Sequence, residues 1–134
     1  IKKTTKSRLS IEYANREDTK RHLILCNDQP VGEINYQWNS RHLFKKESKT
    51  AWAGILIGED SARGKGLGFI AVQFLEKQIL KDNGDRIELS VFEFNKPALV
   101  LYQKLGYQEI GRISKLTFWN GKLWNSIQME KIIA

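Results

Sequence analysis

The sequence predicts a single α/β (α+β) domain over residues 1–134, with a mixed, mostly antiparallel sheet flanked by helices. Short segments of alternating apolar residues predict strands, as at Ile87, Leu89 and Val91. Two segments with apolar residues at steps of three and four predict helices between the strands. Hydrophobic residues make up 41% of the chain, which is enough for one core.

The first elements predicted are a helix and a hairpin. Residues 7–20 are polar with a few apolar positions, and we expect a helix there. His22–Cys26 and Val31–Trp38 are apolar runs separated by a turn signal, Asn27-Asp28-Gln29-Pro30. These two runs therefore predict paired strands.

A loop, a strand and a helix follow the hairpin. Residues 39–49 are polar and basic and predict a loop, and Thr50–Ile57 predicts an apolar strand. The next helix is predicted from one apolar stripe, formed by Leu67, Ile70, Ala71, Phe74, Leu75 and Ile79. Asn83-Gly84 predicts the end of this helix.

The second half of the chain predicts a strand and a second helix. Arg86–Phe92 alternates and predicts the strand. Asn95-Lys96-Pro97 is typical of a helix start, with Asn as the cap and Pro in the first turn. The helix ends at Gly106, and its inner face is predicted to hold Ala98, Leu101, Tyr102 and Leu105.

The C-terminal part predicts further strands. Tyr107–Ile113 is the first of these. Asn120-Gly121 is a strong signal for a two-residue hairpin turn, and it joins Leu116–Trp119 to Lys122–Lys131.

The bulk composition limits the class of protein. A formal net charge of +7 favours anionic partners, without choosing among phosphates, nucleic acid and acidic surfaces. No apolar run approaches the ~18 residues of a membrane span, and no secretory signal is visible. The single cysteine, Cys26, excludes an internal disulfide framework, so we expect a cytoplasmic protein.

The segment from residue 54 to residue 68 is the most informative. It leads from a strand into a loop, and three glycines alternate over Gly64–Gly68 at the start of a helix. Glycine lets the backbone approach a ligand closely, and the first amides of a helix have no internal partner. Arg63 and Lys65 add positive charge, so the segment predicts a phosphate cradle.

Two other phosphate motifs do not fit this segment. A P-loop starting at Gly58 would need glycine where Arg63 stands, and Ser or Thr where Gly66 follows Lys65. The dinucleotide fingerprint starting at Gly64 would need glycine where Phe69 stands.

Two motifs together resemble the GNAT acetyltransferase family. Arg63-Gly64-Lys65-Gly66-Leu67-Gly68 is similar to the family's Gln/Arg-x-x-Gly-x-Gly/Ala pyrophosphate loop. Asn95, Ala98 and Leu101–Tyr107 resemble its Asn-x-x-Ala-x-x-Leu-Tyr-x-Lys-x-Gly-Phe/Tyr segment. The resemblance extends over residues 22–131.

The tail of the chain resembles one branch of that family. From Gly111 onward, with Asn120-Gly121-Lys122 and Met129, it looks like the branch that contains ribosomal-protein-alanine and spermidine acetyltransferases.

The resemblance implies a binding site for acetyl-CoA as cosubstrate, with no metal. The acetyl-CoA would lie across a splayed gap between two parallel strands, Ala51–Ile57 and Arg86–Phe92. Main-chain amides of Gly64–Gly68 would hold the pyrophosphate. The pantetheine arm would pair with the edge of the first of these strands, as an added strand does. A main-chain amide of the same strand would polarise the thioester carbonyl. The implied binding residues are Ile55, Leu56, Ile57, Arg63, Gly64, Lys65, Gly66, Leu67, Gly68, Asn95, Ala98 and Tyr102.

The resemblance also assigns catalytic roles. Tyr102 matches the family's general acid, which protonates the departing thiolate, and Asn95 matches a position near the pantetheine arm. The base that takes the proton of the amine is left open among Glu33, Glu59 and Glu93. We favour Glu93, because the end of its strand lies near the gap.

Two departures from the family pattern stand out. Many members of the branch carry an acidic residue where this chain has Trp52 and Ala53, so Trp52 is a candidate for the acceptor pocket or for the core. The family also has a strand and a helix before the hairpin, and only residues 1–21 precede it here. Whether part of the acceptor wall is missing, trimmed or supplied by a partner chain is left open.

The resemblance implies an N-acetyltransferase that moves an acetyl group from acetyl-CoA to a primary amine by direct attack. We expect a small-molecule acceptor, namely an amino sugar, a polyamine or an aminoglycoside, with a protein N-terminus as the alternative. We expect no nucleic-acid or membrane partner, and a homodimer is a candidate assembly. The alternatives from other classes are a non-catalytic CoA-binding module and a basic nucleic-acid-binding domain.

Overall fold

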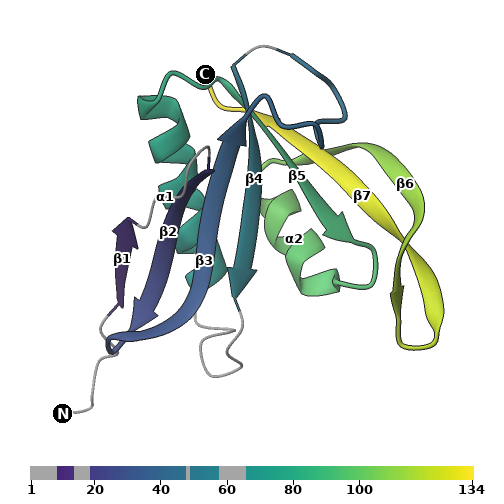
Figure 1. Cartoon of the computed structure of the whole chain (residues 1–134), viewed down its shortest axis with the longest axis horizontal. Helices are drawn as coiled ribbons and strands as arrows, with labels where there is room; N and C mark the ends of the chain where they lie inside the picture. Colours follow the sequence, from purple (N-terminus) through teal and green to yellow (C-terminus); the bar gives the residue numbers. More distant parts are fainter. Residues whose placement is uncertain (1–8, 14–18, 48, 58–65) are drawn as a thin grey trace.

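The computed structural model describes residues 9–13, 19–47, 49–57 and 66–134 (Figure 1). One sheet has the strand order β1-β2-β3-β4-β5-β7-β6, and only β4 and β5 pair in parallel. The elements are β1 (Leu9–Tyr13), β2 (Thr19–Cys26), β3 (Gln29–Trp38), β4 (Thr50–Ile57), α1 (Leu67–Lys81), β5 (Arg86–Phe92), α2 (Lys96–Lys104), β6 (Gln108–Trp119) and β7 (Lys122–Ile132). The predicted mixed, mostly antiparallel sheet with helices is confirmed.

The predicted helix over residues 7–20 is wrong in the part that the structure describes. Leu9–Tyr13 is a strand, and Thr19 already begins β2. Leu9, Ile11 and Tyr13 alternate with polar residues, and this period of two suits a strand paired along the edge of β2. The strand that the family resemblance requires before the hairpin is therefore present.

Two hairpin turns have the conformation that their residues favour. Asn27 and Asp28, between β2 and β3, have positive φ angles of 52° and 65°. Asn120 and Gly121, between β6 and β7, have φ angles of 50° and 84°. Consecutive positive φ angles match the right-handed twist of the flanking strands, and Asn, Asp and Gly adopt them readily. The predicted strands 107–113 and 116–119 form the single strand β6.

Helix α1 covers the sheet with a face slightly different from the predicted one. Leu67, Ala71, Leu75 and Ile79 are buried as expected, together with Val72. Ile70, predicted on the buried stripe, is instead exposed. Gly84 follows the helix in close contact with Ile79 and Trp38, where a larger residue would not fit.

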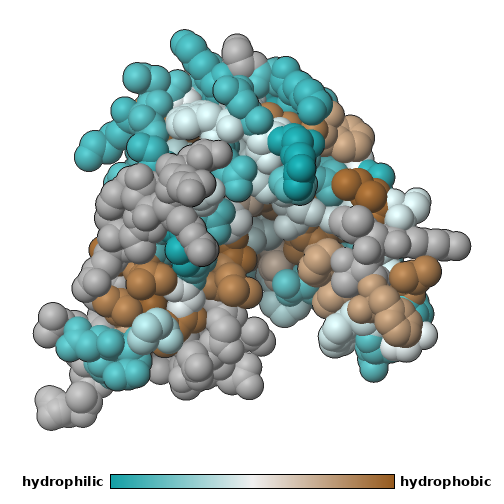
Figure 2. All heavy atoms as spheres, viewed as in Figure 1, coloured by the Kyte–Doolittle hydropathy of each residue, from teal (hydrophilic) through white to brown (hydrophobic). Residues whose placement is uncertain are grey.

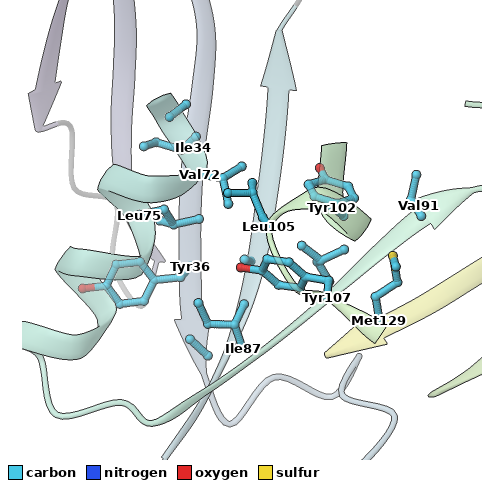
Figure 3. Close-up of a cluster of buried hydrophobic side chains, with 14 of the residues drawn as sticks. Ile34, Tyr36, Val72, Leu75, Ile87, Val91, Tyr102, Leu105, Tyr107 and Met129 are labelled. Carbon is cyan, nitrogen blue, oxygen red and sulfur yellow. The ribbon is translucent and has the colours of Figure 1, made fainter. Parts of the chain in front are cut away.

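The sheet has one apolar face and one polar face around its centre. Ile87, Leu89 and Val91 of β5 belong to the same buried core as the inner residues of α1 and Tyr102 of α2. Figure 3 labels Ile87, Val91 and Tyr102 in this core. Side chains alternate along a strand, so Glu88 and Ser90 lie on the opposite face. This division places different chemistry on the two sides of β5.

Candidate active site

Strands β4 and β5 pair at one end and separate at the other. Their described parallel ladder has three pairs, Thr50↔Arg86, Ala51↔Ile87 and Trp52↔Glu88. Beyond Trp52, β4 stays paired with β3 up to Ile57, whereas β5 stays paired with β7 up to Phe92. Figure 1 shows the two strands diverging. The sheet therefore opens between them, as the splayed pair predicted from the family resemblance requires.

The separated end of β4 offers main-chain groups to a ligand. Its edge toward β5 has no ladder partner from Ala53 to Ile57 among the described residues. The Leu56 side chain is 69% exposed. The outline of the molecule is notched between this region and the β6–β7 hairpin (Figure 2). An extended chain could pair with this edge as an added strand does.

The start of α1 follows the same end of β4. Gly66, its N-cap residue, has a φ of 74° and makes no side-chain cap, and the first turn contains no acidic residue. The Gly66 carbonyl accepts the hydrogen bond of the Ile70 amide, 3.1 Å away. Gly66 thus offers no side-chain cap to the first amides, and within the described residues this helix start is of the kind that binds an anion. Arg63, Gly64 and Lys65, with Glu59, lie outside the described residues.

Helix α2 begins where β5 ends. The side-chain oxygen of Asn95 accepts the hydrogen bond of the Ala98 amide, 3.3 Å away, which confirms the predicted cap. Ala98 is partly buried against the core. The structure therefore places the start of α2 and the start of α1 after the same ends of the two parallel strands.

Tyr102 is buried on the apolar side of the sheet. It is 6% exposed, and its ring lies 5.8 Å from the ring of Tyr107. Burial raises the pKa of Tyr102 to about 12. The phenol is protonated at neutral pH, as an ordinary tyrosine also is, and a general acid needs that proton.

A cavity of about 370 Å³ lies on the polar side of the sheet, where β4 and β5 begin to separate. Its sheet residues are Trp52 of β4, Ser90 of β5, Ile113 of β6 and Gln128 of β7, and its loop residues are Arg41, His42, Leu43 and Phe44. Ser90 and Tyr102 thus lie on opposite faces of β5. A ligand in this cavity would approach the gap from the side opposite the phenol.

A buried ion pair fixes the loop that walls this cavity. Arg86 and Glu88 are 2% and 0% exposed, and the guanidinium donates to the carboxylate over 2.7 Å. Glu88 also accepts the main-chain amides of Phe44 and Lys45, at 2.6 and 2.8 Å. Arg86 further donates to Glu130 and Thr50, at 2.8 and 3.1 Å. The loop is therefore bonded to β5 directly below the cavity.

A second polar cluster forms part of the cavity floor. The side-chain amide of Gln128 donates to the hydroxyls of Ser90 and Ser126, each 3.1 Å away, and the two hydroxyls bond to each other. Gln128 is 1% exposed, and its carbonyl oxygen has no hydrogen-bond partner among the described residues. That oxygen is itself completely buried, so a ligand in the cavity would not reach it without a rearrangement of the floor.

The sequence profile of the Acetyltransferase (GNAT) family matches residues 2–107. The chain belongs to the GNAT acetyltransferase family. Enzymes of this family use acetyl-CoA as cosubstrate and act on amines. The family profile thus agrees with the separated β4–β5 pair.

Known proteins similar to this GNAT chain include several acetyltransferases. A mycothiol acetyltransferase of Corynebacterium jeikeium is 32% identical over 88 residues, which cover 63% of this chain and 26% of that protein. The L-amino acid N-acetyltransferase AaaT of Escherichia coli is 29% identical over 116 residues, which cover 84% of this chain and 68% of AaaT. The chain therefore spans about a quarter of the first relative and two thirds of the second.

A solved GNAT structure from Streptococcus pneumoniae shares the fold. It aligns with a TM-score of 0.74 at 23% identity, over 88% of this chain and 69% of that one. At this identity the match supports the architecture alone.

The two described candidates for the base both have partners. Glu93 accepts the main-chain amide of Asn125 at 3.0 Å and pairs with Arg112 at 3.4 Å. Glu33 pairs with Arg21 and accepts a hydrogen bond from Asn35 at 2.8 Å. Glu93 lies just beyond the end of β5, where the strands have separated, whereas Glu33 lies on β3.

Sequence reasoning missed several groups around the GNAT site. It did not single out Arg41, Glu88, Ser90 or Gln128. The pattern Arg86-x-Glu88-x-Ser90, with three polar residues on one face of an otherwise apolar central strand, was the available signal. Trp52, left between pocket and core, lines the cavity.

The described residues hold neither a candidate metal cluster nor a helix that could span a membrane. No group of three or more His, Cys, Asp or Glu residues could hold a metal ion. No described helix is long and apolar enough to cross a bilayer.

Proposed function

We propose that this GNAT domain transfers an acetyl group from acetyl-CoA to the primary amine of a small molecule. The observation that carries the proposal is the separation of β4 from β5 beyond Trp52, with a buried tyrosine on one side and a cavity on the other. We also propose that residues 1–134 act as one domain.

The described residues fit acetyl-CoA. The edge of β4 from Ile55 to Ile57 offers amides and carbonyls to the pantetheine arm. Leu67 and Gly68, at the uncapped start of α1, would hold pyrophosphate together with Gly66, and we assign the same task to Arg63, Gly64 and Lys65. When bound, acetyl-CoA supplies an acyl group activated as a thioester.

The chain's own groups would then act on the reaction from two sides. The amide of Leu56 or Ile57 would donate to the developing oxyanion, an interaction worth about 100- to 1,000-fold in rate. Tyr102, which is protonated at neutral pH, would donate its proton to the departing sulfur. The amine would attack from the cavity side, and alignment of both reactants supplies much of the rate.

Glu93 stays our candidate for the base that takes the proton of the amine, directly or through a water. Its position beyond the end of β5 supports this assignment. Its bonds to Arg112 and to the Asn125 amide hold the carboxylate in one place. We propose that Asn95 and Ala98 shape the pantetheine site at the start of α2.

We retain the small-molecule acceptor as a proposal, with a protein N-terminus as the alternative. The similarity to AaaT, which by its name acetylates L-amino acids, supports a small acceptor. The branch of ribosomal-protein-alanine and spermidine acetyltransferases stays a proposal that rests on the tail from Gly111. The cytoplasmic location and a homodimer are proposals too.

Calorimetry with CoA, followed by a screen of amines with acetyl-CoA that reads released thiol, tests this function. We expect CoA to bind at micromolar concentration and at least one amine to release thiol. If CoA does not bind at high micromolar concentration, the proposal fails. If CoA binds and no amine of a broad panel reacts, a non-catalytic CoA-binding module becomes the better account.

A further inference from the structure

We infer that the cavity accepts an amine that also carries a carboxylate, as a free α-amino acid with an apolar side chain does. The inference rests on the proposed function and names the acceptor of that same site. Two features of the cavity support it, namely the charge of its wall and its apolar lining.

The charge of the wall favours an anionic group on the acceptor. Arg41 lines the cavity, and no carboxylate is among the lining residues that the structure describes. Glu88, just below, is already neutralised by Arg86 and by two main-chain amides. A polyamine would place a second cation beside Arg41, and like charges brought together disfavour binding. A carboxylate would pair with the guanidinium instead, in its two-pronged geometry.

The lining also includes apolar side chains. Trp52 rises from the sheet, with Ile113 and Phe44 around it. The Trp52 ring lies 5.7 Å from the ring of His42 at an interplanar angle of 31°, so loop and sheet meet across an aromatic contact. A volume of about 370 Å³ is near the lower limit of small-molecule sites and suits a ligand of amino-acid size.

The floor of the cavity lies beside the gap between β4 and β5. Its polar residues are Ser90 and Gln128, and the Gln128 amide donates to the Ser90 hydroxyl. Gln128 is directly opposite Ser90 in the β5–β7 ladder, two residues beyond the last β4–β5 pair at Glu88. An amine bound at this floor would lie beside the gap, and its carboxylate would face the loop that carries Arg41.

A matched set of acceptors tests the inference. Thiol release from acetyl-CoA is measured with L-phenylalanine, L-phenylalaninamide, phenethylamine, spermidine and glucosamine. We expect kcat/KM for L-phenylalanine to exceed the values for the amide and for phenethylamine at least tenfold, because these two lack the carboxylate. Equal or higher kcat/KM for the amide, spermidine or glucosamine would overturn the inference.

Two charge variants of the loop locate the effect. Arg41→Gln should raise KM for L-phenylalanine at least tenfold and leave KM for phenethylamine unchanged. Lys46→Gln removes a charge from the same loop at a residue outside the cavity lining. It should change neither the KM for L-phenylalanine nor the KM for phenethylamine. An Arg41→Gln enzyme that still prefers L-phenylalanine contradicts the inference. Calorimetry with CoA is done in parallel, because lost CoA binding would point to failure of the proposed function instead.

Discussion

The guanidinium of Arg86 donates to the carboxylate of Glu88 over 2.7 Å, and both side chains are almost completely buried. Two neighbouring polar residues of one strand thus bond the loop at Phe44 and Lys45 to the centre of the sheet. The loop around Phe44 and Lys45 is therefore held against the sheet. Because residues 41–44 of this loop line the cavity, one wall of the cavity is hydrogen-bonded to β5.

Replacing Glu88 by Gln should therefore destabilise the fold and loosen the wall of the cavity. Removing one partner of a buried ion pair costs about 3–5 kcal/mol, and Glu130 compensates Arg86 in part, so we expect a loss of about 3 kcal/mol. Denaturant unfolding measures the loss, and steady-state kinetics should show a higher KM for the acceptor with an unchanged KM for acetyl-CoA. Glu109→Gln, which removes an exposed partner of Arg112, should leave stability unchanged. A Glu88→Gln protein as stable as this control would contradict the assignment.

Tyr102→Phe removes the proposed proton donor and keeps the buried ring. We expect kcat to fall about 100- to 10,000-fold, while the Kd for CoA stays the same. Stopped-flow or steady-state thiol release gives kcat, and calorimetry gives Kd. Tyr107→Phe serves as the control, because that hydroxyl donates to Glu76 and lies outside the proposed site. An unchanged kcat in Tyr102→Phe would remove the acid role and leave the family assignment intact.

Glu93→Gln tests the base without losing the contact to β7, since an amide oxygen can still accept the Asn125 amide. If Glu93 takes the proton of the amine, kcat/KM should fall at least tenfold and the acidic limb of its pH profile should disappear. Glu109→Gln is the matched control, because it also removes a partner of Arg112. Equal kinetics in the two variants would move the base to Glu33 or Glu59.

Gly66→Ala tests the start of α1 as part of the CoA site. An added Cβ meets no atom of the described residues within 4 Å, and the φ of 74° penalises a side chain. This backbone strain costs about 1–2 kcal/mol and should shift the first amides of the helix, which weakens CoA binding. Gly121→Ala has a similar φ of 84° and equally open space in the distant β6–β7 turn. The Gly121→Ala protein should lose similar stability and keep its affinity for CoA, as measured by calorimetry. An equal loss of CoA affinity in the two variants would contradict the assignment of the start of α1 to the CoA site.

Local sequence patterns predicted most of the helices and strands, and the pairing of strands decided the remaining ones. The bounds of β4 and β5 match the predictions, because their apolar runs end at clear turn and cap signals. The helix expected over residues 7–20 is wrong at residues 9–13, since the short alternation at Leu9, Ile11 and Tyr13 becomes a strand only by pairing with β2. Local motifs singled out residues 63–68 and Tyr102, and their roles stay predictions. The cavity could not be predicted in this way, because Arg41, Trp52 and Gln128 come from distant segments that only the fold brings together.

The two buried tyrosines predict how stability depends on pH at the alkaline end. Burial raises the pKa of Tyr102 to about 12, and burial together with the Glu76 carboxylate raises that of Tyr107. Below the unfolded value of about 10, both are protonated in both states and contribute no slope. Above it, the unfolded chain releases these protons first, so the free energy of unfolding falls by about 1.4 kcal/mol per pH unit for each tyrosine. Urea unfolding at a series of pH values should show a smaller decline for Tyr102→Phe than for the wild type, and identical slopes would contradict the burial of this phenol.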